Sequence, residues 1–195
     1  MSGVSDKVRS SAMLHLTRRG ALASVATLAA AFPVRKPVAE EELQSLSALT
    51  LTNPPASLPE VTFYDAEGQP HGFAEFRGHG MVVNLWATWC VPCVAEMPAL
   101  AALSQALAPD DIAVMPLSSD RGGANAVRGF FAQHGIAGLP VLLDPKGGVL
   151  KAWGIDGIPV TVLIDRAGRE RARLEGAADW ASPAAIARVR ALVSA

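Results

Sequence analysis

Hydrophobic positions between residues 58 and 193 fall into short runs of strand length and longer stretches with helical spacing. The spacing predicts a helix over Cys93–Leu107, a second helix capped by Ser118–Asp120, and a last helix that Ser182 and Pro183 start and Val193 ends. The runs of strand length lie at 61–64, 81–86, 112–117, 141–143, 160–164 and 170–174.

Helices and strands therefore alternate for most of this region, and the last two strands flank a turn at Asp165–Gly168. An order of β, β, α, β, α, β, β, β, α favours an α/β fold, with a mixed central sheet between layers of helices. The folded domain is expected to span 58–195, because residues 34–57 mix proline and charge without a sustained period and are typical of a linker.

The first 33 residues have a different character from the rest of the chain. Arg18 and Arg19 precede 13 mostly apolar residues, whereas a membrane-spanning helix needs roughly 20. The pattern predicts an export signal over 1–33, with Ala29–Ala31 as a possible cleavage site. The paired arginines are compatible with the twin-arginine route as well as with general export.

Charge adds one exclusion. The formal net charge is −1, and basic residues are concentrated in the first 36 positions, so the remaining chain is mildly acidic. An acidic body gives no support for nucleic-acid binding.

The two cysteines, Cys90 and Cys93, stand between the strand at 81–86 and the helix that follows. A bond between them closes a very small loop and adds little folding entropy, which favours redox chemistry. Zinc is disfavoured because a second pair of ligands at suitable spacing is absent from the sequence. A helix N-terminus stabilises a thiolate, so we expect Cys90 to attack a client disulfide and Cys93 to resolve the mixed disulfide. Pro92 fixes the backbone between them.

Several neighbours of the cysteines have two possible interpretations. Trp89 adjoins the nucleophile and could form client surface, whereas Trp86 is expected to pack in the core. Glu96 shares a helical face with Cys93, and it either exchanges protons with the thiol or is an ordinary solvated charge. Pro98 should kink the helix. Pro140 and Pro159 occur in similar local sequences, so the local sequence does not indicate which of the two, if either, follows a cis peptide bond.

The stretch MVVNLWATWCVPCVAEMP at 81–98 resembles the thioredoxin superfamily, and more narrowly exported oxidoreductases of the TlpA/ResA/DsbE type. Segments at 76–78, 144–147, 153–159 and 163–168 agree with that family, so the resemblance covers about 58–193. It implies a thioredoxin-like fold with the TlpA-type α/β element inserted before the terminal hairpin.

The resemblance also assigns roles to individual residues. Cys90 and Cys93 match the redox pair, and Pro159 matches the family's cis-proline, which leaves the Ile158 backbone free to pair with a client. Glu96 matches an acidic residue near the thiols and Pro98 a kink proline.

Two positions depart from the patterns of the superfamily. Asn84 stands where cytosolic thioredoxins have a buried aspartate, which leaves Glu96 as its substitute in proton transfer. Val160 stands where the family often has threonine after the cis-proline.

By resemblance, the function is that of an exported protein-disulfide reductase without metal or cofactor. Its clients would be apocytochrome c or a copper-site protein of respiratory oxidase, and its electrons would come from a membrane thiol–disulfide donor. One alternative is an oxidase that introduces disulfides. Another is a copper-handling chaperone or interaction domain, which would favour a Cys-x-x-x-Cys and a matched histidine.

Overall fold

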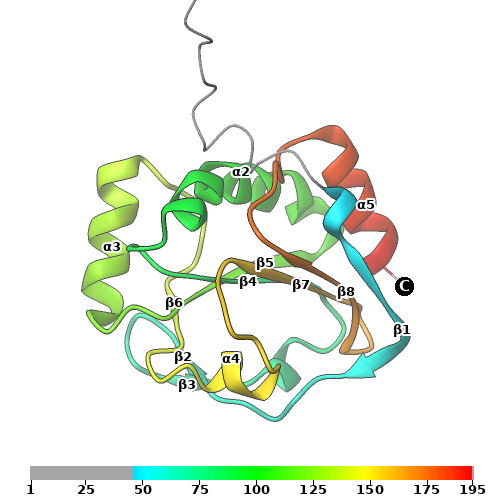
Figure 1. The fold of residues 1–195 in the computed structure, drawn as a ribbon, viewed down its shortest axis with the longest axis horizontal. Helices are drawn as coiled ribbons and strands as arrows, with labels where there is room; N and C mark the ends of the chain where they lie inside the picture. The colour runs from blue at the N-terminus through cyan, green and yellow to red at the C-terminus, as the bar shows by residue number, and fades with distance from the viewer. Residues whose placement is uncertain (1–45, 195) are drawn as a thin grey trace, which may run out of the picture. The chain divides into compact units, whose positions relative to one another are not determined.

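The central strand β4 (Gly80–Trp86) is buried along its whole length. The structure is a computed structural model, and it describes residues 46–194 (Figure 1). The expected export signal at 1–33 lies outside the described residues, as does the first part of the expected linker. Side chains of Met81, Val83 and Leu85 enter one core cluster, and those of Val82 and Trp86 enter the other. This alternation is the period-two geometry of a strand that is covered on both faces.

Eight strands form one mixed sheet in the order β1-β8-β7-β4-β5-β6-β2-β3. β4 pairs in parallel with β5 and antiparallel with β7, which confirms the mixed sheet expected from the order of elements. The remaining strands are β1 (Thr50–Ser57), β2 (Phe63–Tyr64), β3 (Pro70–His71), β5 (Ile112–Ser118), β6 (Leu142–Leu143), β7 (Val160–Ile164) and β8 (Arg169–Glu175).

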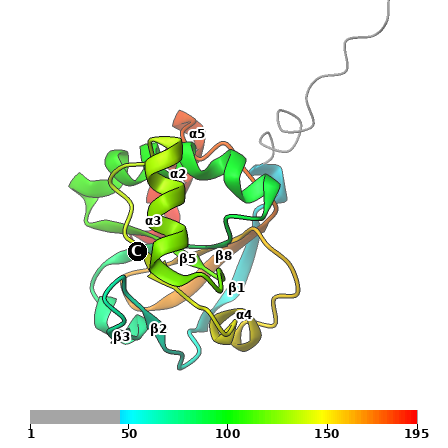
Figure 2. The same ribbon diagram turned by 90° about the vertical axis from the view of Figure 1, so that its left-hand side faces the viewer.

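Helices cover both faces of the sheet. Figure 1 shows α2 (Val91–Leu107), α3 (Gly123–His134) and α5 (Pro183–Val193) on one face and α4 (Gly148–Ala152) on the other. Turned by 90°, Figure 2 places α3 toward the viewer, on the side of the sheet that carries β6. The short 3-10 helices are η1 (Leu46–Ala48), η2 (Phe73–Phe76) and η3 (Ala108–Asp110).

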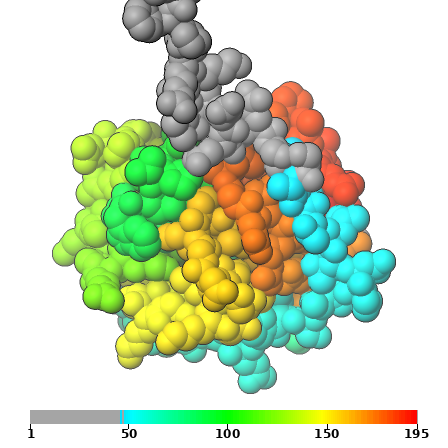
Figure 3. All heavy atoms as spheres, in the orientation of Figure 1, coloured from blue at the N-terminus to red at the C-terminus, as the bar shows by residue number. Residues whose placement is uncertain are grey.

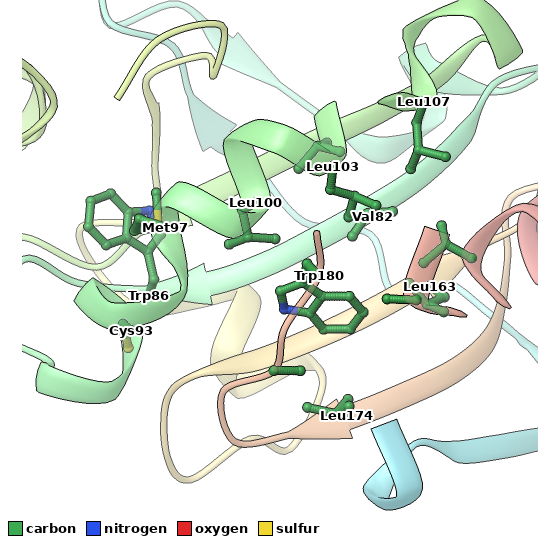
Figure 4. Close-up of a cluster of buried hydrophobic side chains, with 14 of the residues drawn as sticks. Val82, Trp86, Cys93, Met97, Leu100, Leu103, Leu107, Leu163, Leu174 and Trp180 are labelled. Carbon is green, nitrogen blue, oxygen red and sulfur yellow. The ribbon is translucent and has the colours of Figure 1, made fainter. Parts of the chain in front are cut away.

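The long helix α2 forms much of the core beneath its own layer. Leu100, Leu103 and Leu107 are fully buried and pack with Val82 and Leu163 of the sheet (Figure 4). Among the described residues, the segment Val91–Asp110 is long and apolar enough to cross a membrane by length and composition. Its leucines instead face the sheet, as in the core helix of a globular domain.

The expected linker at 34–57 is wrong for its last eight residues. Thr50–Ser57 forms β1, which pairs antiparallel with β8 at the edge of the sheet, and its register shifts between Leu51 and Ala56. Pro54 and Pro55 made this segment look unstructured. An edge strand tolerates proline because one side of its backbone needs no ladder hydrogen bonds.

The expected cap of α3 is also wrong. Its N-cap is Gly122, which has no side-chain cap bond. The Asp120 carboxylate instead accepts hydrogen bonds from the Thr88 amide at 2.9 Å and from the Thr88 and Ser118 hydroxyls at 2.6 and 2.7 Å. Asp120 therefore fixes the loop between β4 and α2, which ends at Cys90. By contrast, Ser182 caps α5 as expected.

Candidate active site

Cys90 and Cys93 form a disulfide where the chain passes from β4 into α2. Cys90 is the N-cap of α2, with extended backbone, and Pro92 lies in the first turn. The backbone N–H of Cys93 points at Cys90 Sγ, at 3.3 Å. The sulfur thus occupies the place of the side-chain oxygen in an ordinary N-cap, where backbone donors and the helix dipole favour negative charge.

The two cysteines differ in what covers them. Cys93 is fully buried and Cys90 keeps only 6% of its surface exposed, but Cys90 is flanked by the two most exposed large apolar side chains of the described residues, Trp89 at 68% and Val91 at 76%. Trp86 is buried and stacks on Phe131 with ring centroids 5.8 Å apart, so it packs in the core as expected. An approaching molecule would meet the Cys90 side of the disulfide first.

The segment before β7 lies against the disulfide. The Ile158–Pro159 peptide is cis, as the resemblance implied, whereas the Leu139–Pro140 peptide is not. The Ile158 carbonyl oxygen lies 3.8 Å from Cys90 Sγ, although the two residues are 68 positions apart in sequence. The segment that ends in the cis-proline Pro159 therefore borders the Cys90 sulfur.

A shallow cleft of about 270 Å³ opens beside this contact. It brings together Pro92 from α2, Ile158 and Pro159 from the segment before β7, Gly176 and Ala177 from the segment after β8, and Ala48 and Glu175. Figure 3 shows the corresponding green, golden and orange segments side by side on one face of the molecule. The cleft is mostly apolar and has one carboxylate, that of Glu175, at its rim.

Glu96 is fully buried on the face of α2 that also carries Cys93, and is not a solvated charge. Oε1 accepts a hydrogen bond from Asn84 Nδ2 at 2.8 Å. Oε2 accepts from Trp180 Nε1 at 2.9 Å and from the Ala178 amide at 3.2 Å. Burial raises the pKa of Glu96 to about 7, and the three hydrogen bonds oppose that rise. The carboxyl group can therefore gain or lose a proton near neutral pH.

Asn84 links Glu96 to the sheet. Its Nδ2 also donates to Thr161 Oγ1 at 3.0 Å, while its Oδ1 lacks a hydrogen-bond partner among the described residues. The Asn84 amide does not ionise near neutral pH, so Asn84 can orient Glu96 but cannot replace it in proton transfer. Pro98 lies on the exposed face of α2, and it lacks the N–H that would bond the Val94 carbonyl.

Sequence reasoning missed Trp180, Ala178 and Thr161, which hold Glu96 directly or through Asn84. Trp180 is 84 residues from Glu96, and neither a shared motif nor a period connects them. The one available signal was a tryptophan among the small residues of the short connection between the last strand and the last helix. Within residues 46–194, no group of three or more His, Cys, Asp or Glu side chains is placed to hold a metal ion.

Comparison with known proteins agrees with this geometry. The Redoxin family matches residues 54–187. Thiol-disulfide oxidoreductase ResA of Geobacillus thermodenitrificans is 30% identical over 121 residues, which are 62% of this chain and 68% of that protein. A thiol:disulfide interchange protein DsbE homolog of Paracoccus denitrificans is 39% identical over 88 residues, which are 45% of this chain and 46% of that protein.

Solved structures support the fold. A thiol:disulfide interchange protein of the thioredoxin family from Chlorobium tepidum has a TM-score of 0.57 at 24% identity and covers 71% of this chain and 95% of its own. A thiol:disulfide interchange protein from Bacteroides has a TM-score of 0.59 at 22% identity, covering 72% and 90%. With its Cys-x-x-Cys disulfide at the strand–helix junction, this chain belongs to the Redoxin family and is a thiol–disulfide oxidoreductase of the ResA/DsbE type with a thioredoxin-like fold.

Proposed function

We propose that the protein is an exported reductase that breaks disulfides in specific proteins of the cell envelope. The observation that carries the proposal is the asymmetry of the cysteine pair. Cys90 Sγ faces a backbone donor at the helix N-terminus and lies 3.8 Å from the carbonyl oxygen of Ile158, a residue that lines the apolar cleft, while Cys93 is fully buried. This arrangement suits one attacking thiol and one resolving thiol.

In the first step, the Cys90 thiolate attacks a client disulfide. One client sulfur leaves as a thiolate and takes a proton, and a mixed disulfide joins Cys90 to the other client sulfur. The Cys93 N–H at 3.3 Å from Cys90 Sγ and the dipole of α2 lower the free energy of the thiolate relative to the thiol. Cys90 is thereby prepared as the nucleophile at neutral pH.

In the second step, Cys93 attacks Cys90 Sγ and releases the second client thiol. Cys93 must first lose its proton, and its complete burial disfavours the charged thiolate. Glu96 is the base proposed for this step, because it shares the helical face of Cys93 and has a pKa of about 7. The proton passes to the departing client sulfur, and the Cys90–Cys93 disulfide remains.

The client is proposed to lie in the cleft beside Cys90. Trp89 provides exposed apolar surface on one side, and Pro92, Ile158 and Pro159 line the floor. An extended client segment can pair with the backbone at Ile158, whose carbonyl oxygen is 3.8 Å from Cys90 Sγ. Such pairing brings a client disulfide to the sulfur without requiring a particular side chain.

The place of action and the partners rest on the sequence and on the relatives. The apolar run after Arg18 and Arg19 supports export to the periplasm, with the domain free or tethered at its N-terminus. The clients proposed from the family resemblance of the sequence are apocytochrome c or a copper-site protein of respiratory oxidase. A membrane thiol–disulfide protein would supply the two electrons that reduce Cys90–Cys93 after each turnover.

Trapping of the mixed disulfide tests the proposal. Cys93→Ser should accumulate adducts with cysteine-containing envelope proteins, and Cys90→Ser should form none. The double variant is the control for noncovalent capture. Turnover of a peptide disulfide by either single variant at the wild-type rate would refute the two-step scheme. If the Cys90–Cys93 pair oxidises peptide dithiols faster than it reduces peptide disulfides, the result would favour the alternative function, an oxidase that introduces disulfides.

A further inference from the structure

We propose that Trp180 is a positioning residue for Glu96: its indole N–H holds the carboxylate in the charged form and thereby sets the pH range in which Cys93 is deprotonated. The inference rests on the base role proposed for Glu96. It begins from the loop between β8 and α5, residues 176–182, which approaches the active site from a distant part of the sequence.

Trp180 is placed firmly enough to orient a carboxylate. Its side chain is fully buried in the cluster beneath α2, and Figure 4 shows it beside Leu100 and near Leu174. From there Nε1 donates to Glu96 Oε2 at 2.9 Å. Because packing fixes the ring, little conformational entropy is lost when the hydrogen bond forms.

The surroundings of Glu96 make this donor influential. Asn84 faces it from β4, with Thr161 of β7 behind, and Ala178 and Trp180 face it from the loop. None of these groups ionises, and burial and three hydrogen bonds account for the shifted pKa without any contribution from a charged side chain in the described part of the chain.

The ionisable residues near Glu96 and its donors in sequence are Cys93, three positions before Glu96 on α2, and Asp179 in the loop. Cys93 is the neighbour on α2 and becomes titratable when the disulfide is reduced. Asp179 separates Ala178 from Trp180 in the loop, but its side chain is exposed and accepts a hydrogen bond from the Ala181 amide at 3.1 Å. In the absence of an ion pair, hydrogen-bond donors control how readily Glu96 loses its proton.

The direction of the effect follows from the chemistry. A donor to the carboxylate favours the charged form, so removal of the indole N–H should raise the pKa of Glu96 above about 7. A hydrogen bond to a charged group is worth enough to move the pKa by about one unit. At pH 7 the charged fraction would then fall roughly fivefold, and the rate of the Cys93 step would fall with it.

Trp180→Phe and Trp86→Phe provide a matched comparison. Both tryptophans are fully buried in the same cluster, but Trp86 Nε1 has no partner among the described residues. The carbon-13 resonance of the Glu96 carboxyl is titrated in the oxidised protein, where neither cysteine ionises, and is assigned by its loss in Glu96→Gln. We expect Trp180→Phe to raise the midpoint of the Glu96 titration by about one pH unit and Trp86→Phe to leave that midpoint unchanged.

Should Trp180→Phe fail to fold, benzothienylalanine incorporated at Trp180 keeps the fused rings and replaces only the N–H. An unchanged carboxyl midpoint with either replacement overturns the proposal, as does an equal shift in Trp86→Phe. The second measurement is the pH dependence of single-turnover reduction of a peptide disulfide, expected to move to higher pH by the same amount. If the titration midpoint of the Glu96 carboxyl shifts but the pH dependence of the single-turnover rate does not, Glu96 is not the base, and the link from Trp180 to Cys93 falls with it. Failure of the Trp180 proposal and failure of the base role are therefore distinguishable.

Discussion

Glu96→Gln should remove a large pH dependence from the stability of the oxidised protein. Burial raises the pKa of Glu96 from its ordinary 4.5 to about 7. A carboxyl group with a raised pKa in the folded state holds its proton more tightly there than in the unfolded chain. Its stabilising contribution is complete below about pH 4.5 and is lost as the pH rises through about 7.

The size of the effect follows from the shift. At about 1.4 kcal/mol per pKa unit, the free energy of unfolding of the wild type should fall by about 2.5 kcal/mol between pH 5 and pH 8 through this group alone. The glutamine side chain of the variant has no proton to lose, so the difference between variant and wild type should change by that amount, in favour of the variant at high pH. In a domain of this size the change corresponds to roughly 5–10 °C in Tm.

Urea unfolding of both oxidised proteins at half-unit intervals from pH 5 to pH 8 measures the difference directly. Other titrating groups, such as His71 with its raised pKa, contribute equally to both proteins and cancel. Glu60→Gln, at an exposed position, controls for the substitution itself. Independent substitutions are additive to within about 0.5 kcal/mol. If the stability difference between Glu96→Gln and wild type stays constant within that scatter over this pH range, the carboxyl group titrates normally. Glu96 would then be excluded as a base near neutral pH.

Three further outcomes are expected. Leu103 is a buried residue of α2. Leu103→Ala should lower the free energy of unfolding by about 2–5 kcal/mol in urea, without changing the dependence of that free energy on urea concentration. A chain that starts at residue 58 loses β1 and exposes the edge of β8. It should unfold at a lower temperature and associate more, as measured by light scattering, than a chain that starts at residue 46. Equal behaviour of the two chains would contradict the assignment of β1 to the domain. His71→Gln should destabilise the protein below about pH 6.5 and have little effect above pH 8. The His71 ring donates hydrogen bonds to the Glu75 and Asp65 carboxylates, which raise the His71 pKa, and their benefit is lost as the pH rises through that pKa.

The central parts of the fold could be predicted because their sequences contain one strong signal each. Residues 81–86 are apolar except for Asn84 and form the central strand, and the helical pattern over 93–107 belongs to the core helix that follows it. Short or irregular elements gave no such signal. β3 has two residues and α4 has five, and β1 carries two consecutive prolines, so local propensity and sheet pairing point in opposite directions there.

The candidate site was predictable to the extent that it is local. Cys90, Pro92 and Cys93 lie in one turn, and their spacing alone indicates redox chemistry. Ile158 and Pro159 are brought to Cys90 by the pairing of β7 with β4. That pairing follows from the fold, so only the resemblance to a known family selected Pro159 over Pro140.

The behaviour of Glu96 could not be predicted from its neighbours in sequence, because opposing effects from three separate parts of the chain decide it. α2 buries the carboxyl group, β4 contributes one donor, and the loop after β8 contributes two more. Burial without these donors would leave the group protonated well above neutral pH, and the donors without burial would leave it ionised well below it. The base role proposed for Glu96 beside a buried thiol requires both, and it therefore assigns the loop at Trp180 to the chemistry of the site together with the helix that follows Cys90.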